Sequence, residues 1–131
     1  MRILLTEDDD SVRAFVSRAL ELDGHDVDTA CHGVEALERL TEMEGAYDLL
    51  VTDVKMPIMD GIALAHEASG QWPGLPILLM TGFADQRERA EDLAEKIRDV
   101  VTKPFTLEQI REAVTGAATA DEDTEEAEKA A

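Results

Sequence analysis

The chain has 131 residues, 44% of them hydrophobic, and its 30 Asp and Glu against 12 Lys and Arg give a net charge of −18. This length fits one domain with a buried core, and the strong acidity argues against nucleic acid and membrane surfaces as direct partners. The lone Cys31 excludes a disulfide-stapled secreted fold, and the start of the chain lacks the layout of a signal peptide, so we expect a cytoplasmic protein.

Short apolar runs alternate with amphipathic segments along most of the chain. In chain order, the predicted elements are a strand at 3–6, a helix between 11 and 23, a strand at 25–29, a helix at 33–44, a strand at 47–52, a helix starting at 60–61, a strand at 75–80, a helix at 85–96, a strand at 99–102 and a last helix capped by Thr106. Asp10 or Ser11 is placed to cap the first helix.

The predicted strands are apolar throughout instead of alternating between apolar and polar residues. This pattern is typical of a parallel sheet that is covered by helices on both faces, so we expect an α/β fold built from five βα units. In such sheets, functional groups gather beyond the carboxyl ends of the strands.

The end of the chain differs in composition from the rest. Residues 119–131 hold six acids and one base and show no apolar periodicity. We therefore expect a folded domain over residues 1–118, followed by an acidic, disordered tail over residues 119–131.

Charged and polar side chains stand at four of the predicted strand ends. Glu7 and Asp8 follow the first strand, Asp53 the third, Thr81 ends the fourth, and Lys103 follows the fifth. Carboxylates that converge at one edge repel one another, and a hard divalent cation such as Mg²⁺ relieves that repulsion. A lysine and a hydroxyl would supply donors to a transferred phosphoryl group, so the set points to phosphoryl chemistry with an aspartate as covalent acceptor.

Four segments that carry these residues resemble the receiver domain of bacterial response regulators, over residues 1–118. They read ILLTEDDDSVR, DLLVTDVKMPIMDGIALA, ILLMTGFAD and VVTKPF. The resemblance implies a flavodoxin-like, doubly wound sheet of five parallel strands in the order 2-1-3-4-5. It also implies a protein that catalyses only its own phosphorylation and dephosphorylation, and that is not an enzyme acting on external substrates.

The resemblance further implies roles for individual residues. Asp53 would take a phosphoryl group from the phosphohistidine of a histidine kinase or histidine phosphotransferase. Mg²⁺ would be held by Asp8 directly, by Glu7 through water, and by Asp53 and the backbone carbonyl of Lys55.

Two more site residues and one departure come from the same resemblance. Thr81 would hydrogen-bond one phosphoryl oxygen, Lys103 would pair with another, and the peptide bond before Pro104 would be cis. Many receivers have an aromatic residue three positions before the lysine, where this chain has Val100. Coupling between the threonine and an aromatic side chain therefore cannot operate in its usual form.

A more specific resemblance is to small single-domain regulators of the CpdR type, from alphaproteobacterial cell-cycle control. It implies an output through protein–protein contact that steers ClpXP-mediated proteolysis, with a ClpX-type protease or its adaptors as partner. The final Ala130-Ala131 resembles the small apolar tags that ClpX recognises.

Other functions remain open at this stage. The chain could instead be an intermediate phosphorelay receiver or a chemotaxis-type single-domain receiver. A different class, the aspartyl-nucleophile phosphatases of the haloacid-dehalogenase type, expects a second Asp two residues after the nucleophile. Here that position is Lys55, which argues against this class.

Overall fold

A computed structural model describes residues 1–56, 58–82 and 97–117 of the chain. The helix predicted at residues 85–96 and the tail predicted at residues 119–131 lie outside these described residues.

The described residues form a five-stranded sheet in which every neighbouring pair of strands is parallel. The strands are β1 (Arg2–Thr6), β2 (Asp26–Ala30), β3 (Leu49–Asp53), β4 (Ile77–Thr81) and β5 (Asp99–Thr102). Their order is β2-β1-β3-β4-β5, which confirms the predicted doubly wound, flavodoxin-like topology. All five strands therefore end at the same edge of the sheet.

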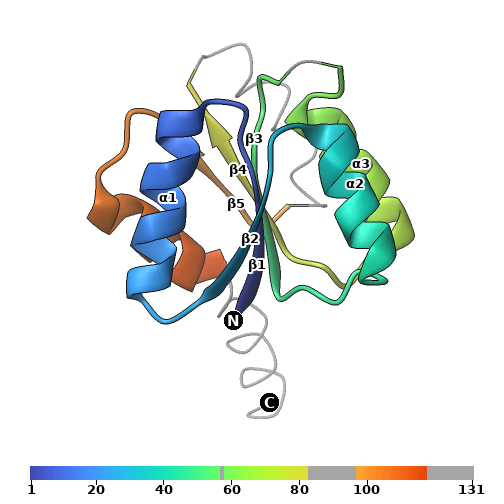
Figure 1. The fold of residues 1–131 in the computed structure, drawn as a ribbon, viewed down its shortest axis with the longest axis horizontal. Coiled ribbons are helices and arrows are strands. Elements are labelled where there is room, and N and C mark those ends of the chain that lie inside the picture. The colour runs from blue at the N-terminus through green and yellow to red at the C-terminus, as the bar shows by residue number, and fades with distance from the viewer. Residues whose placement is uncertain (57, 83–96, 118–131) are drawn as a thin grey trace, which may run out of the picture.

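Helices cover both faces of the sheet (Figure 1). They are α1 (Asp10–Leu22), α2 (Gly33–Glu42), α3 (Gly61–Gln71) and a C-terminal helix that is described over residues 107–117. In Figure 1, α1 and the orange-red C-terminal helix lie on one side of the sheet, and α2 and α3 lie on the other. This three-layer arrangement buries the central strands on both faces and explains why their sequences are continuously apolar.

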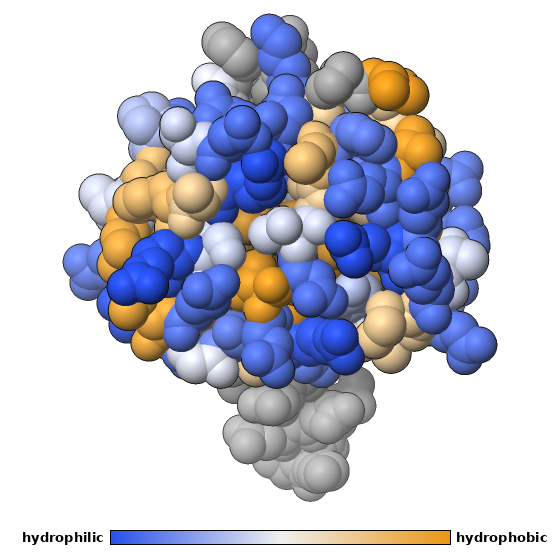
Figure 2. Space-filling model, in the orientation of Figure 1, coloured by the Kyte–Doolittle hydropathy of each residue, from blue (hydrophilic) through white to orange (hydrophobic). Residues whose placement is uncertain are grey.

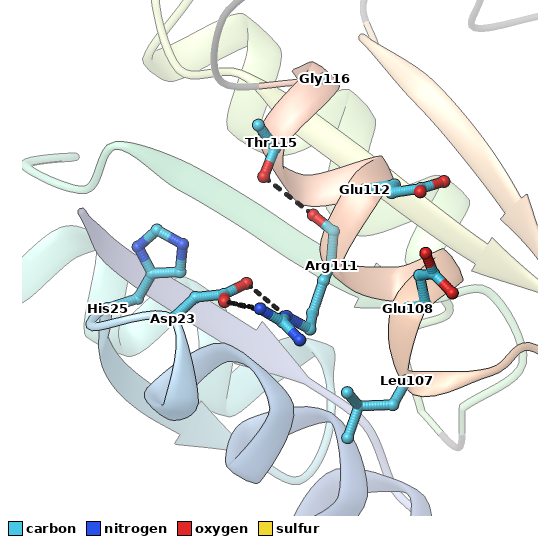
Figure 3. Close-up of a pocket in the computed structure, with 8 residues that line it drawn as sticks. All are labelled: Asp23, His25, Leu107, Glu108, Arg111, Glu112, Thr115 and Gly116. Carbon is cyan, nitrogen blue, oxygen red and sulfur yellow. Dashed lines mark hydrogen bonds and ion pairs between the residues drawn. The ribbon is translucent and has the colours of Figure 1, made fainter.

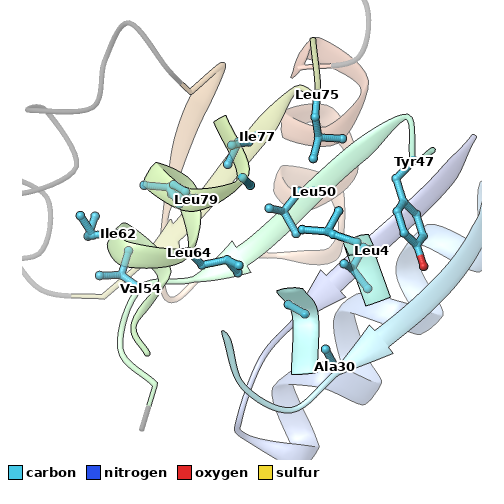
Figure 4. Packing of buried hydrophobic residues seen from close by; sticks show 14 residues of the cluster. Leu4, Ala30, Tyr47, Leu50, Val54, Ile62, Leu64, Leu75, Ile77 and Leu79 are labelled. Atoms are coloured by element: carbon cyan, nitrogen blue, oxygen red, sulfur yellow. The ribbon is translucent and has the colours of Figure 1, made fainter. Parts of the chain in front are cut away.

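The core is divided by the sheet into two clusters of buried side chains. One lies on the side of α2 and α3 and is shown in Figure 4, where Leu4, Leu50 and Leu79 of three adjacent strands point toward the helices. The other contains Ile3, Leu5 and their neighbours, packed against side chains of α1 and the C-terminal helix. Every residue of β3 and of β4 is buried, so these two strands fix the centre of the fold.

The cap of α1 differs by one residue from the sequence-based expectation. Asp9, not Asp10 or Ser11, is the N-cap: its backbone is extended, and its carboxylate accepts hydrogen bonds from the backbone N–H groups of Ser11 and Val12. Sequence alone could not choose among Asp9, Asp10 and Ser11, because each has the short polar side chain that a cap needs.

The C-terminal helix begins as predicted. The Thr106 hydroxyl accepts a hydrogen bond from the Gln109 N–H, and the Gln109 side chain accepts one from the Thr106 N–H. This reciprocal pair is a capping box, and it fixes the first turn of the helix directly after β5.

The surface of the molecule is mostly polar. On the face seen in Figure 2, hydrophilic side chains dominate and apolar ones are scattered between them. None of the helices in the described part of the chain combines the length and the apolar character needed to cross a bilayer.

Candidate functional site

Three carboxylates meet at the carboxyl edge of the sheet. In the register of β1 and β3, Thr6 pairs with Thr52, so the residues that follow, Glu7 and Asp53, lie side by side. Oxygen atoms of Glu7, Asp8 and Asp53 all lie within 4.8 Å of one another. Glu7 is 1% exposed and Asp53 5% exposed, whereas Asp8 is exposed to solvent. The sequence-based expectation that these residues converge is thus met by the geometry.

The ammonium group of Lys103 lies between the two buried carboxylates. Its Nζ is 2.9 Å from Oε2 of Glu7 and 2.9 Å from Oδ1 of Asp53. The Lys103 backbone N–H donates to the carbonyl of Thr81 at 2.7 Å, which extends the β4–β5 pairing and brings the lysine to the same edge as the acids. The lysine thus bridges the ends of β1 and β3, although 96 residues separate it from Glu7.

Burial and mutual repulsion make this cluster electrostatically unbalanced. Burial, opposed by the hydrogen bond from Lys103 and reinforced by the charge of Asp53, raises the pKa of Glu7 to about 7. Burial likewise raises the pKa of Asp53, against the stabilising contact with Lys103. Burial alone would lower the pKa of Lys103, but its hydrogen bonds to Asp53 and Glu7 raise it. One half-buried cation therefore faces two buried carboxylates, with Asp8 close by.

The four consecutive acids at residues 7–10 have four different environments. Glu7 is the buried partner of Lys103, Asp9 caps α1, and Asp10 pairs with Arg13. Asp8 is exposed and accepts no hydrogen bond from the described residues. Asp8 is therefore the acid of this run whose oxygens are available to a ligand in solution.

The donor set fits Mg²⁺. All the available atoms are oxygens, the kind of ligand that this hard cation prefers, and a divalent charge would offset the excess of carboxylates. Glu7, Asp8, Asp53 and Lys103 line an open cavity of about 250 Å³. Lys55, whose carbonyl is a predicted ligand, lines the same cavity and is exposed. A small hydrated ion and a phosphoryl group can therefore reach Asp53 from solvent.

Thr81 is the predicted site residue that stands apart from this cavity. It is the last residue of β4 and is fully buried. Among the described residues, its neighbour Gly82 lines the cavity, and Thr81 does not. Val100, which replaces the aromatic residue of many receivers, packs half-buried against the cluster of side chains shared with α2 and α3. The peptide bond between Lys103 and Pro104 is cis, as expected from the resemblance.

Two residues that support the site were missed by the sequence reasoning. A Cβ atom on Gly61 would lie 2.1 Å from the backbone carbonyl oxygen of Asp53, so only glycine lets the start of α3 approach the phosphoacceptor strand this closely. Arg13 donates a hydrogen bond to the backbone carbonyl of Glu7. In the sequence, Gly61 marks only the start of a helix after Asp60, and no local signal indicates where Arg13 reaches.

Comparison with known proteins agrees with this geometry. The family profile described as the response regulator receiver domain matches residues 3–115. The chain is 42% identical over 109 residues to the response regulator receiver protein CpdR of Brucella abortus (strain 2308), covering 83% of this chain and 89% of that protein. It is 38% identical over 108 residues to the sensor kinase CckA of the same organism, covering 82% of this chain but 11% of that protein.

A solved structure shows the same fold. The response regulator protein TrrA of Thermotoga maritima, in complex with Mg²⁺ and BeF, superimposes with a TM-score of 0.78 at 28% sequence identity, covering 88% of this chain and 97% of that one. The family profile spans most of the chain, and the CpdR relative is similar over nearly its whole length. The chain therefore belongs to the response regulator receiver family.

Proposed function

We propose that this chain works as a single-domain response regulator whose Asp53 accepts a phosphoryl group from the phosphohistidine of a histidine kinase or histidine phosphotransferase. One observation carries the proposal: Asp53 lies in a solvent-open cavity beside two further carboxylates and within 2.9 Å of the Lys103 ammonium. This combination offers a nucleophile, a cation for phosphoryl oxygens and a place for a divalent ion.

The transfer follows from the positions of these groups. An oxygen of the Asp53 carboxylate attacks phosphorus while the phosphorus–nitrogen bond to the donor histidine breaks, and the imidazole leaves with the electron pair and takes up a proton. The transition state spreads negative charge over the equatorial oxygens, so positioned cations stabilise it. Lys103 already contacts Asp53 and needs little movement to pair with one of these oxygens. Asp8, Asp53, the carbonyl of Lys55 and, through water, Glu7 would hold Mg²⁺, which would supply further positive charge.

Thr81 has a later role in this proposal. Its hydroxyl is buried at the end of β4, one residue from the cavity, so it must shift to hydrogen-bond a phosphoryl oxygen on Asp53. Phosphorylation of Asp53 therefore moves Thr81 at the end of β4. Val100 of β5 is aliphatic, so the change passes to the surface without rotation of an aromatic ring at this position.

The protein is not a phosphatase of external substrates in this proposal. Two residues after Asp53, where aspartyl-nucleophile phosphatases need an acid, the chain has Lys55 at the rim of the cavity. An ammonium group at this place cannot protonate a leaving group and then act as base in the way a carboxyl group does. Asp53 is therefore phosphorylated and dephosphorylated in a cycle that serves signalling.

The output that we propose is protein–protein contact. The similarity to CpdR over nearly its whole length supports a cytoplasmic regulator of that type, with ClpXP-mediated proteolysis in the cell cycle as the process controlled and a ClpX-type protease or its adaptors as partner. The similarity to a segment of CckA supports a histidine kinase as the origin of the phosphoryl group.

Incubation with acetyl phosphate and Mg²⁺, followed by intact-protein mass measurement, tests the phosphoacceptor. We expect one phosphoryl group per chain for the wild type, none for Asp53→Asn, and wild-type behaviour for Asp26→Asn, an exposed acid at the other end of the sheet. Modification that persists in Asp53→Asn contradicts the proposal, and many turnovers of a phosphate ester support the phosphatase instead.

The output is tested by pull-down with wild-type protein and Asp53→Ala, each with and without beryllofluoride. We expect the set of captured partners to change with beryllofluoride for the wild type only. Identical partners at equal affinity in all samples would contradict a phosphorylation-dependent output.

A further inference from the structure

Arg13 of α1 reaches back to the segment that carries the metal-site acids. Its Nη1 donates a hydrogen bond to the backbone carbonyl of Glu7 at 3.0 Å, and its Nη2 pairs with the carboxylate of Asp10. The side chain is 19% exposed, so most of it is packed against the protein. One guanidinium group thus ties the first residue of the four-acid run to the last.

The backbone of this run is held at several other points. The Glu7 N–H donates to the carbonyl of Ala30 at 3.1 Å, and the Asp9 N–H donates to Oε1 of Glu7 at 3.1 Å. Asp8 lies between these fixed residues, and its side chain accepts no hydrogen bond from the described part of the chain. The backbone on either side of Asp8 therefore sets where its Cα–Cβ bond starts, and so which space its carboxylate can reach.

We propose that Arg13 is a positioning residue: by fixing the Glu7 carbonyl and Asp10 together, it aims the Asp8 carboxylate at the oxygens of Glu7 and Asp53 and so sets the affinity for Mg²⁺. This inference rests on the Mg²⁺ site of the proposed function, and it adds a residue that contacts neither the ion nor the phosphoryl group. Replacement of residues that hold the metal ligands in place without contacting the ion commonly changes metal affinity by about tenfold or more.

The sign of the effect separates positioning from simple electrostatics. Arg13 is a cation beside an acidic cluster, so Coulomb repulsion alone predicts that its removal strengthens the binding of a divalent cation. Loss of positioning predicts the opposite, because the backbone that carries Asp8 can then move the carboxylate away from Glu7 and Asp53. Weaker binding after removal of a positive charge has no electrostatic explanation.

Calorimetric titration of the full chain with Mg²⁺ alone, at fixed ionic strength, provides the test. We expect Arg13→Gln to weaken Mg²⁺ binding about tenfold. We expect Arg13→Lys also to weaken it, because an ammonium keeps the charge but not the fork that spans two acceptors. Asp10→Asn is the matched control: the asparagine oxygen can still accept from Arg13, so both contacts of the guanidinium remain while one negative charge is lost, and Mg²⁺ affinity should stay within about twofold of wild type.

A double-mutant cycle with Asp8→Asn shows whether Arg13 acts through Asp8. If Arg13 acts only by positioning Asp8, then Arg13→Gln should have little further effect on Mg²⁺ affinity in a protein that already carries Asp8→Asn. Thermal unfolding without Mg²⁺ identifies any variant that does not fold, in which case Arg13→Lys decides the question.

Affinity that is unchanged or stronger in Arg13→Gln, or full additivity with Asp8→Asn, overturns the inference while leaving the Mg²⁺ site standing. A wild-type protein that binds no Mg²⁺ overturns both this inference and the proposed metal dependence. Asp53 phosphorylation by acetyl phosphate, measured separately, then shows whether the phosphoacceptor survives.

Discussion

Two ion-pair clusters tie distant parts of the chain together at opposite ends of the sheet, and they differ in balance and in burial. At the carboxyl end, Lys103 faces both Glu7 and Asp53, which are buried. At the other end, Arg111 of the C-terminal helix forms hydrogen bonds from Nε to both carboxylate oxygens of Asp23, the residue that follows α1 (Figure 3). Arg111 is 43% exposed and lines an open hollow of about 950 Å³.

The difference shows what each cluster is for. One cation and one anion balance each other at the solvent-exposed Arg111–Asp23 pair, which simply holds the C-terminal helix against the end of α1. Two buried carboxylates share one ammonium at the carboxyl end, an arrangement that costs stability because burial disfavours the uncompensated charge. An excess of buried negative charge of this kind is expected where a ligand adds positive charge, as the proposed Mg²⁺ does.

The largest expected effect comes from removing the cation of the buried cluster. Lys103→Met leaves the carboxylates of Glu7 and Asp53 together without a counter-charge, and we expect it to lower the free energy of unfolding by about 3 kcal/mol at neutral pH. Urea denaturation in the presence of a chelator measures this change. Added Mg²⁺ should restore part of the loss, because it neutralises the same carboxylates.

Arg111→Met is the matched control for this substitution. The exposed pair is screened by water and salt, so the free energy of unfolding should stay within the precision of the urea titration. Equal losses of unfolding free energy in the two variants would contradict a larger contribution from Lys103 than from Arg111.

A smaller effect is expected from pH. Because the pKa of Glu7 in the folded protein is about 7, against an ordinary value of 4.5, the folded state retains a proton that the unfolded state releases between these values. Stability therefore falls as pH rises through this window, by on the order of 2 kcal/mol. The raised pKa of Asp53 acts in the same direction. Unfolding free energies at pH 5 and pH 8, measured without Mg²⁺, test the slope.

Glu7→Gln isolates the contribution of this one carboxyl group. The lowered pKa of His25 makes stability rise with pH in part of the same range, so the decisive quantity is the difference between wild type and variant, in which His25 cancels. The variant should lose most of the downward slope. Wild-type and variant curves that run parallel from pH 5 to pH 8 would contradict the assignment to Glu7.

The sequence predicted the fold, and the meeting of charged side chains at one edge of the sheet, for a physical reason. A parallel sheet buried on both faces requires apolar strands, and it brings all strand ends to one edge, so Glu7, Asp8, Asp53 and Lys103 were expected at that edge once the five strands were recognised. The resemblance to receivers added the strand order, which the register of β1 with β3 confirms.

The individual contacts within the site could not be predicted in the same way. Four adjacent acids have the same local chemistry, and only the path of the backbone decides that Asp9 caps α1, that Asp10 meets Arg13, and that Asp8 stays exposed. The need for glycine at residue 61 depends on how closely α3 approaches β3, a packing distance that no pattern of residues encodes.

The smallest expected effect concerns two neighbouring threonines at the carboxyl end of the sheet. Both are fully buried, and they pair across β1 and β3. The Thr52 hydroxyl donates a hydrogen bond to the Asp53 carbonyl at 3.0 Å, whereas the Thr6 hydroxyl has no hydrogen-bond partner within the described residues. Burying a hydroxyl without a partner costs more than a methyl group in its place.

Thr6→Val should therefore raise the free energy of unfolding by about 1 kcal/mol, and Thr52→Val should lower it by a similar amount, because only the second substitution removes a hydrogen bond. The two variants lose the same hydroxyl at adjacent positions, so differences in shape and strand propensity largely cancel. If urea denaturation gives changes of opposite sign in the free energy of unfolding, then the Thr6 hydroxyl is a second polar group at the carboxyl end whose burial is not compensated. A loss of stability in Thr6→Val would instead mean that uncompensated burial at this edge is confined to the charged cluster of Glu7, Asp53 and Lys103.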